Sequence, residues 1–210
     1  ISKNKKNIII SGLSTNSKEI KKNYIFFAIK GKKNNGEKFI KDAVYKGASV
    51  VVCSKGCKIR NKSILIIKTN KIRNLLSNVA SKFYNLKPKN IIAVTGTNGK
   101  TSVSDLFYQI LRINNKRAAS IGTLGIKYDD KIIKTNLTSP DTITLHKNLD
   151  FLRNKKINNV IIEASSHGLD QKRLHDIKFR GAIFTNFSQD HLDYHKTMKS
   201  YLNAKLILFR

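Results

Sequence analysis

An apolar strand that runs into a glycine turn and then into a helix restricts the fold of this chain more than any other feature. Residues 91–101 read Ile-Ile-Ala-Val-Thr-Gly-Thr-Asn-Gly-Lys-Thr. Glycines let a backbone fold around an anion, and the first turn of a helix directs amide hydrogens toward it. The segment therefore predicts a phosphate-binding loop, which consists of Gly96, Thr97, Asn98, Gly99, Lys100, Thr101 and Ser102.

Two side chains of this loop have the chemistry that a nucleoside triphosphate requires. Lys100 would neutralise the β- and γ-phosphates, and the Thr101 hydroxyl would ligate magnesium. The spacing departs from the generic phosphate loop, because Val94 stands where its first glycine is expected. The alternative is a glycine turn that only begins a helix. We expect ATP and Mg²⁺ as ligands.

Apolar runs alternate with helix-like segments along the chain. Pro88 interrupts this pattern because proline cannot continue a helix, and it predicts a boundary between a domain of residues 1–88 and one of residues 89–210. The alternation favours an α/β fold, with a mainly parallel sheet covered by helices on both faces in the second domain. The expected strands are 24–29, 49–53, 64–67, 91–95, 118–121, 160–163 and 182–185, and the expected helices are 37–46, 71–84, 101–113, 144–154 and 198–209.

A carboxylate closes one of the expected strands. Glu163 follows an apolar run and precedes Ala-Ser-Ser-His-Gly. Ligands bind at the carboxyl edge of parallel sheets, and a carboxylate beside a phosphate loop is a natural magnesium ligand. A solvated glutamate is the alternative.

Histidines also gather just beyond expected strands. Three of the five in the chain are His167, His191 and His195. His191 and His195 stand four residues apart in Asp-His-Leu-Asp-Tyr-His, a pattern that could hold a metal or could only cap and hydrogen-bond locally. Their concentration favours a site.

The charge of the chain is +28, with 22 Lys and Arg against 3 Asp and Glu in residues 1–90, and 19 against 10 in residues 91–210. A basic excess attracts polyanions, so a basic ATPase that binds nucleic acid is an alternative function. The lysines are scattered, however, without interleaved aromatic residues for base stacking. We expect no nucleic-acid partner, and we interpret the Lys, Ile and Asn bias as compositional drift, together with an anionic small substrate.

The two cysteines, Cys53 and Cys57, are too few for a zinc site, which needs four ligands. Reduced thiols and a cytoplasmic location are the expectation. The apolar runs are too short to cross a membrane, and the polar, lysine-rich residues 1–7 do not indicate a signal peptide. The missing initiator Met and an end at Arg210 inside an expected helix indicate a fragment.

Three segments together resemble the Mur ligase family. They are Thr-Gly-Thr-Asn-Gly-Lys-Thr at 95–101, Ser-Ser-His-Gly-Leu-x-Gln-x-Arg at 165–173, and Asp-His-Leu-Asp-Tyr-His at 190–195 followed by Tyr-x-x-Ala-Lys at 201–205. The resemblance implies an N-terminal uridine-binding domain, a central ATPase domain and a C-terminal domain for the incoming amino acid. This chain would hold the first domain and half of the second, and alone it is expected to be inactive.

The resemblance also implies an activity, that of an ATP-dependent acid–amino-acid ligase of peptidoglycan synthesis and cell-wall biogenesis. Such a ligase would add a diamino acid, meso-diaminopimelate or L-lysine, to UDP-N-acetylmuramoyl-L-alanyl-D-glutamate through an acyl phosphate. The expected partners are the UDP-N-acetylmuramoyl dipeptide, ATP and the diamino acid, and the expected state is a monomer. Another Mur-type ligase or a folylpolyglutamate synthase is the alternative, against which residues 165–173 argue.

The family pattern assigns residue roles. Lys100, Glu163, His191 and Lys205 are the implied catalytic residues, and Thr101, Glu163, His191 and a Lys205 carbamylated by CO₂ are the implied metal site. From its pattern alone, Lys205 is expected to be a surface lysine beside an apolar stripe. The implied substrate-binding residues are Ser17, Lys32, Lys33, Asn34, Thr138, Ser139, Ser165, Gln171 and Arg173.

The chain departs from the family pattern near its start. Asn16-Ser17-Lys18 replaces a usual Asp-Ser-Arg, and Asn23-Tyr24 replaces a Gly-Asp. Lysine keeps the charge of arginine but loses its bidentate fork. Thr138-Ser139 replaces a Thr-Thr pair and keeps both hydroxyls.

Overall fold

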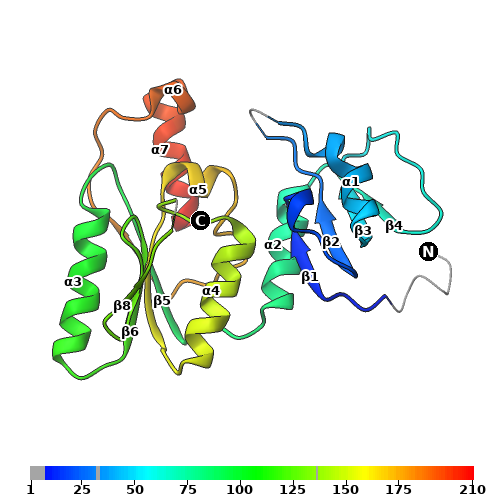
Figure 1. Cartoon of the computed structure of the whole chain (residues 1–210). Helices are drawn as coiled ribbons and strands as arrows, with labels where there is room; N and C mark the ends of the chain where they lie inside the picture. The colour runs from blue at the N-terminus through cyan, green and yellow to red at the C-terminus, as the bar shows by residue number, and fades with distance from the viewer. Residues whose placement is uncertain (1–7, 32–33, 136) are drawn as a thin grey trace. The chain divides into compact units, whose positions relative to one another are not determined.

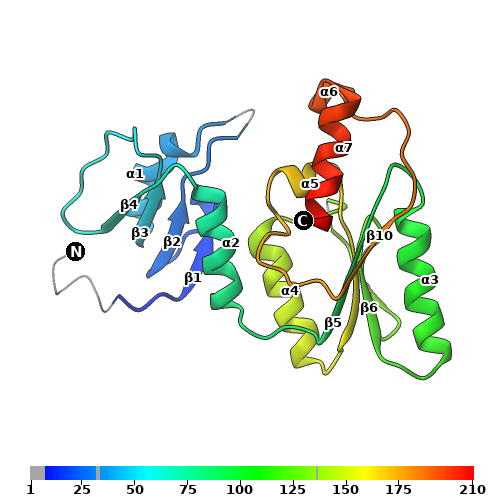
Figure 2. The same cartoon turned by 180° about the vertical axis from the view of Figure 1, so that it is seen from behind.

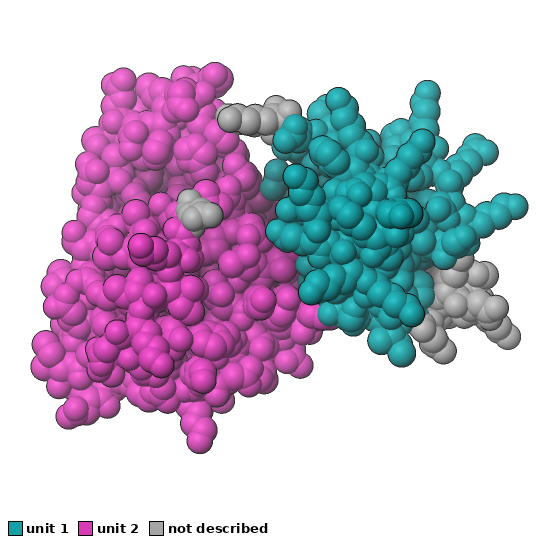
Figure 3. Space-filling view, viewed as in Figure 1, with its two compact units in different colours: residues 1–76 teal, residues 77–210 magenta. Residues whose placement is uncertain are grey.

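The computed structural model describes residues 8–31, 34–135 and 137–210 (Figure 1). The chain divides into two compact units, Ile1–Leu76 and Ser77–Arg210 (Figure 3). Each unit has its own β-sheet. Among the described residues, no helix combines the length and the apolar character that crossing a membrane would require.

The first unit has a sheet of four parallel strands whose order in space is their order in the chain. Phe26 and Val51 pair across this sheet and are fully buried, as is Ile40. Apolar runs of this kind are typical of parallel strands that are covered on both faces. The elements are β1 (Gly12–Ser14), η2 (Ser17–Glu19), β2 (Tyr24–Phe27), η3 (Gly36–Phe39), α1 (Ile40–Tyr45), β3 (Ala48–Cys53) and β4 (Leu65–Lys68).

The second unit has a sheet of six strands in the order β10-β5-β9-β6-β7-β8. The first four run parallel, and β7 and β8 continue the sheet antiparallel. Helix α2 (Ile72–Phe83) precedes this sheet in the chain. The strands are β5 (Asn90–Thr95), β6 (Ala118–Gly122), β7 (Gly125–Tyr128), β8 (Lys131–Ile133), β9 (Asn159–Glu163) and β10 (Gly181–Phe184).

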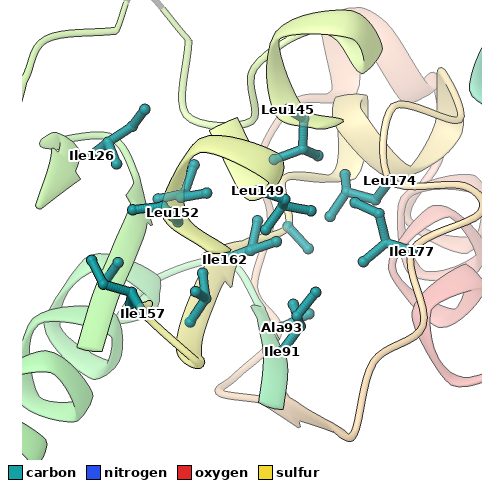
Figure 4. Close-up of a cluster of buried hydrophobic side chains, with 14 of the residues drawn as sticks. Ile91, Ala93, Ile126, Leu145, Leu149, Leu152, Ile157, Ile162, Leu174 and Ile177 are labelled. Atoms are coloured by element: carbon teal, nitrogen blue, oxygen red, sulfur yellow. The ribbon is translucent and has the colours of Figure 1, made fainter. Parts of the chain in front are cut away.

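Helices lie on both faces of this sheet, with α3 (Lys100–Ile113) on one side and α4 (Thr142–Asn154) on the other (Figures 1 and 2). Leu145, Leu149 and Leu152 recur at helical spacing on α4 and are fully buried. They belong to one core cluster with strand residues such as Ala93 and Ile162 (Figure 4). The remaining helices are α5 (Ser166–Asp170), α6 (Leu192–His195), α7 (Met198–Leu206) and η4 (Ile207–Phe209).

The α/β fold with a mainly parallel sheet is confirmed, and every expected strand and helix is present with shifted ends. The helix expected at 37–46 is divided into η3 and α1, and the helix expected at 198–209 ends as η4. The sequence did not predict β1, β7, β8, α5 and α6, which have three to five residues each. Segments this short do not span enough of either hydrophobic period to be recognised.

Candidate functional site

Four parallel strands bring their carboxyl ends to one edge of the second sheet. β5 and β9 pair Val94 with Glu163, and β10 and β5 pair Phe184 with Thr95. A cavity of about 250 Å³ is present there. Its walls include Lys100, Thr101, Thr138, Glu163, His191 and Lys205. The structure therefore gathers residues from four separate predicted segments at one opening.

The phosphate-binding loop connects β5 to α3 and is held from the side by residues that follow β10. Gly96 has a φ of +145°, and a Cβ there would lie 1.9 Å from the Thr185 hydroxyl oxygen. The Asn98 amide donates to the Asn186 side chain at 3.0 Å, and the Thr185 hydroxyl donates to the Asn98 carbonyl at 2.6 Å. Only glycine at position 96 fits both this backbone and this neighbour.

Lys100 folds back over the loop that contains it. Its Nζ donates to the Gly96 carbonyl at 2.9 Å and to the Thr97 carbonyl at 2.7 Å. Burial lowers the pKa of Lys100, while Glu163 and Asp190 oppose that shift. The ammonium group is thus held by neutral carbonyl acceptors. Anionic phosphate oxygens are stronger acceptors and would replace these carbonyls.

Glu163 is almost fully buried at the end of β9, with 2% of its surface exposed. The Thr101 hydroxyl donates to its carboxylate at 3.0 Å. The Thr123 amide and hydroxyl also donate to it, each at 3.1 Å. Donors from both the phosphate-binding loop and the segment after β6 thus fix this buried carboxylate in position.

Lys205 is buried, with 1% of its surface exposed, so the expectation of a surface lysine is wrong. Its Nζ donates to the Gly96 carbonyl at 2.5 Å and lies 4.4 Å from the centre of the Tyr201 ring. Burial, followed by repulsion from Lys100, lowers the pKa of Lys205 from 10.5 to about 8. The apolar stripe of α7 gave no sign of this, because the carbonyl that holds the lysine comes from the distant loop.

The histidines divide between two environments. His191 has a left-handed backbone, with a φ of +52°, and lines the cavity. His195 is buried and its ring packs 5.2 Å from that of Tyr201, while the His167 ring lies 4.9 Å from that of His191. Of these three histidines, His191 lines the cavity, whereas His167 and His195 pack against aromatic rings beside it.

The cavity walls have the donor set for a hard cation. Within residues 8–31, 34–135 and 137–210, no three His, Cys, Asp or Glu side chains converge as a metal site. The Thr101 hydroxyl, however, donates its hydrogen bond to Glu163, so its oxygen lone pairs remain available to a cation. The hydroxyl and the carboxylate thus supply two oxygen ligands side by side. Magnesium commonly takes one or two protein oxygens and fills its shell with water and phosphate oxygens. The residues fit Mg²⁺ that arrives with a triphosphate.

The residues expected to hold the dipeptide form a hydrogen-bonded group beside the cavity. Ser139 donates to the Glu163 carbonyl at 2.8 Å and lies 3.0 Å from the Ser165 hydroxyl. Arg173 donates to the Ser139 carbonyl at 2.7 Å and to the Gln171 side chain at 2.9 Å. Thr138 and Ser165 line the cavity itself, as does Ser102 of the phosphate-binding loop.

The residues expected to contact the UDP-sugar belong to the first unit. Ser17 lies in η2 and is buried, and its hydroxyl lowers the pKa of Asp42 by hydrogen bonding to that carboxyl. Asn34 is exposed, and its carbonyl accepts from the Gly31 amide at 2.8 Å. Lys32 and Lys33 lie outside the described residues. Cys53 and Cys57, also in this unit, are buried free thiols.

Similarity to known proteins gives the family of the chain. Residues 94–210 match the Mur ligase middle domain, and residues 9–84 match the domain described as Mur ligase family, catalytic domain. The chain belongs to the Mur ligase family. Both halves of this Mur ligase sequence are thereby accounted for, and the cavity lies within the matched middle domain.

Several relatives of this Mur ligase share one name. The chain is 46% identical over 204 residues to the UDP-N-acetylmuramoyl-L-alanyl-D-glutamate–2,6-diaminopimelate ligase of Rickettsia montanensis. It is 41% identical over 203 residues to the ligase of that name from Aquifex aeolicus. Each match covers 95% of this chain but only 42% and 41% of the relatives. A solved structure of a ligase of that name superposes with a TM-score of 0.82 at 31% identity, over 95% of this chain and 41% of that one. This Mur ligase chain thus spans less than half the length of the proteins it matches.

Four residues of the site were missed from the sequence. Gly122 ends β6, Thr123 follows it and both contact Glu163, while Thr185 and Asn186 follow β10 and hold the loop. The signal that could have found them is their position, because each pair lies at the carboxyl end of a parallel strand, where ligand sites form.

Proposed function

We propose that this Mur ligase chain provides the ATP site and the UDP-sugar dipeptide site of a ligase that joins 2,6-diaminopimelate to UDP-N-acetylmuramoyl-L-alanyl-D-glutamate. One observation carries the proposal: Lys100, Thr101, Glu163, His191 and Lys205 face a single cavity. The activity for which these relatives are named agrees with that chemistry.

The reaction that suits this site has two stages. The γ-phosphoryl group passes from ATP to an oxygen of the D-glutamate side-chain carboxylate, which gives ADP and an acyl phosphate. The amine of the diamino acid then attacks the acyl carbon, a C–N bond forms, the nitrogen loses a proton and phosphate leaves. Since a free carboxylate is a poor electrophile, the protein mainly has to position the reactants and neutralise charge.

The loop residues have separate roles in this scheme. Lys100 exchanges its two carbonyl acceptors for the phosphate oxygens, and the amides that follow Gly99 meet the same anion. Thr101, Glu163 and His191 would hold Mg²⁺. That ion, when bound, offsets the charge that develops on the transferring phosphoryl group.

Lys205 is proposed to react with CO₂. A neutral amine is the nucleophile for this step, and a pKa of about 8 leaves part of Lys205 neutral near pH 7.5. The ammonium group loses one proton to become the amine, and formation of the N–C bond releases a second. A cation is thereby replaced by a carbamate anion beside Lys100 and the proposed metal ligands. Carbon-13-labelled bicarbonate should give a carbamate signal in the wild type that is absent from Lys205→Arg. An identical signal in the variant would assign it to another amine.

The two substrate groups are proposed to bind in different units. Thr138, Ser139, Ser165, Gln171 and Arg173 would hold the muramoyl dipeptide next to the cavity. Ser17, Lys32, Lys33 and Asn34 would contact the UDP group. We place the reaction in the cytoplasm, where ATP is available, and we propose a monomer.

The proposal is tested in a full-length protein that contains this chain. Phosphate release is measured with ATP, the UDP-muramoyl dipeptide and either 2,6-diaminopimelate or L-lysine. Lys100→Ala should abolish release, whereas Lys116→Ala, an exposed lysine at the far end of α3, should not change it. Unchanged release in Lys100→Ala would overturn the proposal. Steeply salt-dependent DNA binding without ligase activity would favour the nucleic-acid ATPase instead.

A further inference from the structure

The carboxylate of Glu163 is fixed by the turn between β6 and β7. This segment has no part in the proposed binding of ATP, magnesium or the dipeptide. Among the described residues, three hydrogen bonds reach this carboxylate, and Thr123 donates two of them. Its amide donates to Oε1 and its hydroxyl to Oε2, each at 3.1 Å. The other comes from Thr101 of the phosphate-binding loop, to Oε2 at 3.0 Å. Thr123 thus holds both oxygens of the carboxylate.

Gly122 makes room for that carboxylate. A Cβ at position 122 would lie 2.0 Å from Oε1 of Glu163 and 2.3 Å from its Cδ. Gly122 is not among the glycines with positive φ, so its backbone would accept another residue. The requirement at this position is therefore space for Glu163 and not backbone freedom.

The direction of the hydrogen bonds connects Thr123 to Thr138, one of the residues proposed to hold the dipeptide. The Thr123 hydroxyl lies 3.1 Å from both Glu163 and Thr138 but has only one proton. A carboxylate oxygen is a stronger acceptor than a hydroxyl oxygen, so the Thr123 hydroxyl donates its hydrogen bond to Glu163. Thr138 consequently donates to Thr123, and both lone pairs of its hydroxyl oxygen are left to accept from groups in the cavity.

We propose that Gly122 and Thr123 form a carboxylate clamp that positions Glu163 for a divalent cation and connects it, through the Thr123 hydroxyl, to Thr138. Thr123 is a positioning residue in this scheme, because it acts through Glu163. The inference rests on the proposed function, since it requires that the cavity binds a metal–nucleotide complex.

The test measures metal binding and nucleotide binding separately on the 210-residue chain. Binding of Mn²⁺ in the presence of ATP is followed by electron paramagnetic resonance, and binding of ATP alone is followed by calorimetry in EDTA. Thr123→Val should weaken Mn²⁺ binding about tenfold while ATP binding in EDTA stays unchanged, and Thr123→Ser should restore Mn²⁺ binding. Gly122→Ala tests the same carboxylate from its other side and should weaken Mn²⁺ binding in the same way.

Thr144 provides a matched control, because its hydroxyl also donates to a carboxylate, that of Asp141 at 2.6 Å, outside the cavity. Thr144→Val should leave both affinities unchanged. If Thr123→Val and Gly122→Ala both keep the wild-type affinity for Mn²⁺, the clamp proposal is overturned and the proposed function is not affected. Equal losses of Mn²⁺ and EDTA-measured ATP binding would also overturn the clamp, since they indicate general disruption. A wild-type chain that binds neither ATP nor Mn²⁺ would overturn both the clamp and the proposed function.

Discussion

Lys100 and Lys205 share one hydrogen-bond acceptor, the carbonyl oxygen of Gly96, at 2.9 and 2.5 Å. Burial penalises the charged form of Lys205, and repulsion between the two ammonium groups at one oxygen adds to that penalty. The pKa of Lys205 falls to about 8 as a result. The pair therefore separates into a lysine suited to remain a cation and a lysine suited to lose its proton.

The stability of the chain should depend on pH through Lys205. Its folded-state pKa of about 8 lies below its ordinary value of 10.5, so the folded state releases this proton first. The penalty is fully present below pH 8 and disappears as the pH rises toward 10.5. A shift of this size corresponds to about 3 kcal/mol. Urea unfolding from pH 7 to 10.5 should show the free energy of unfolding of the wild type rising relative to that of Lys205→Met by up to this amount. A constant difference would contradict the lowered pKa.

Gly96→Ala should destabilise the chain by at least 1–3 kcal/mol and abolish ATP binding. The φ of +145° is strained for any residue with a Cβ, and the new methyl would meet the Thr185 hydroxyl. Thermal unfolding and calorimetric titration with ATP measure the two effects. Thr185→Ala in the same chain should restore part of the stability, because it removes the clash but not the strain. A double variant no more stable than Gly96→Ala would show that the clash contributes nothing.

Glu163→Gln should weaken Mn²⁺ binding in the presence of ATP by at least tenfold, or about 1.4 kcal/mol. The amide group loses the charge and turns an NH₂ donor toward the donors of Thr101 or Thr123. Electron paramagnetic resonance of Mn²⁺ checks this. Asp129→Asn removes a carboxylate that pairs with Arg117 outside the cavity and should have no such effect. Retained Mn²⁺ affinity in Glu163→Gln would remove Glu163 from the metal site.

Leu149→Ala should destabilise the chain by about 2–5 kcal/mol, the usual range for a fully buried leucine. Its side chain packs in the cluster between α4 and the sheet, away from the cavity (Figure 4). ATP affinity well below the unfolding temperature should therefore be unchanged. Leu106→Ala on the outer side of α3, where 55% of the residue is exposed, should change stability by less than about 0.5 kcal/mol. Equal losses in the two variants would contradict the core described for the second unit.

The sequence predicted those parts of the site that lie at strand ends and helix starts. The loop at 96–101 and the carboxylate of Glu163 follow apolar runs, so their place at the sheet edge could be inferred from parallel pairing alone. The burial of Lys205 could not, because its acceptor is 109 residues away. The contacts of Gly122 and Thr123 could not be inferred either, since Ile-Gly-Thr-Leu-Gly reads as an ordinary turn after the strand expected at 118–121.

The hydrogen bonds that assemble the cavity join partners far apart in the chain, 62 residues for Thr101 with Glu163 and 109 for Gly96 with Lys205. Closing such loops loses entropy before any contact compensates for it, and contacts of this kind form late in folding. No local segment can create the cavity by itself. Refolding monitored by ATP binding should thus lag behind refolding monitored by helix content, and partially folded chains would be unable to capture nucleotide.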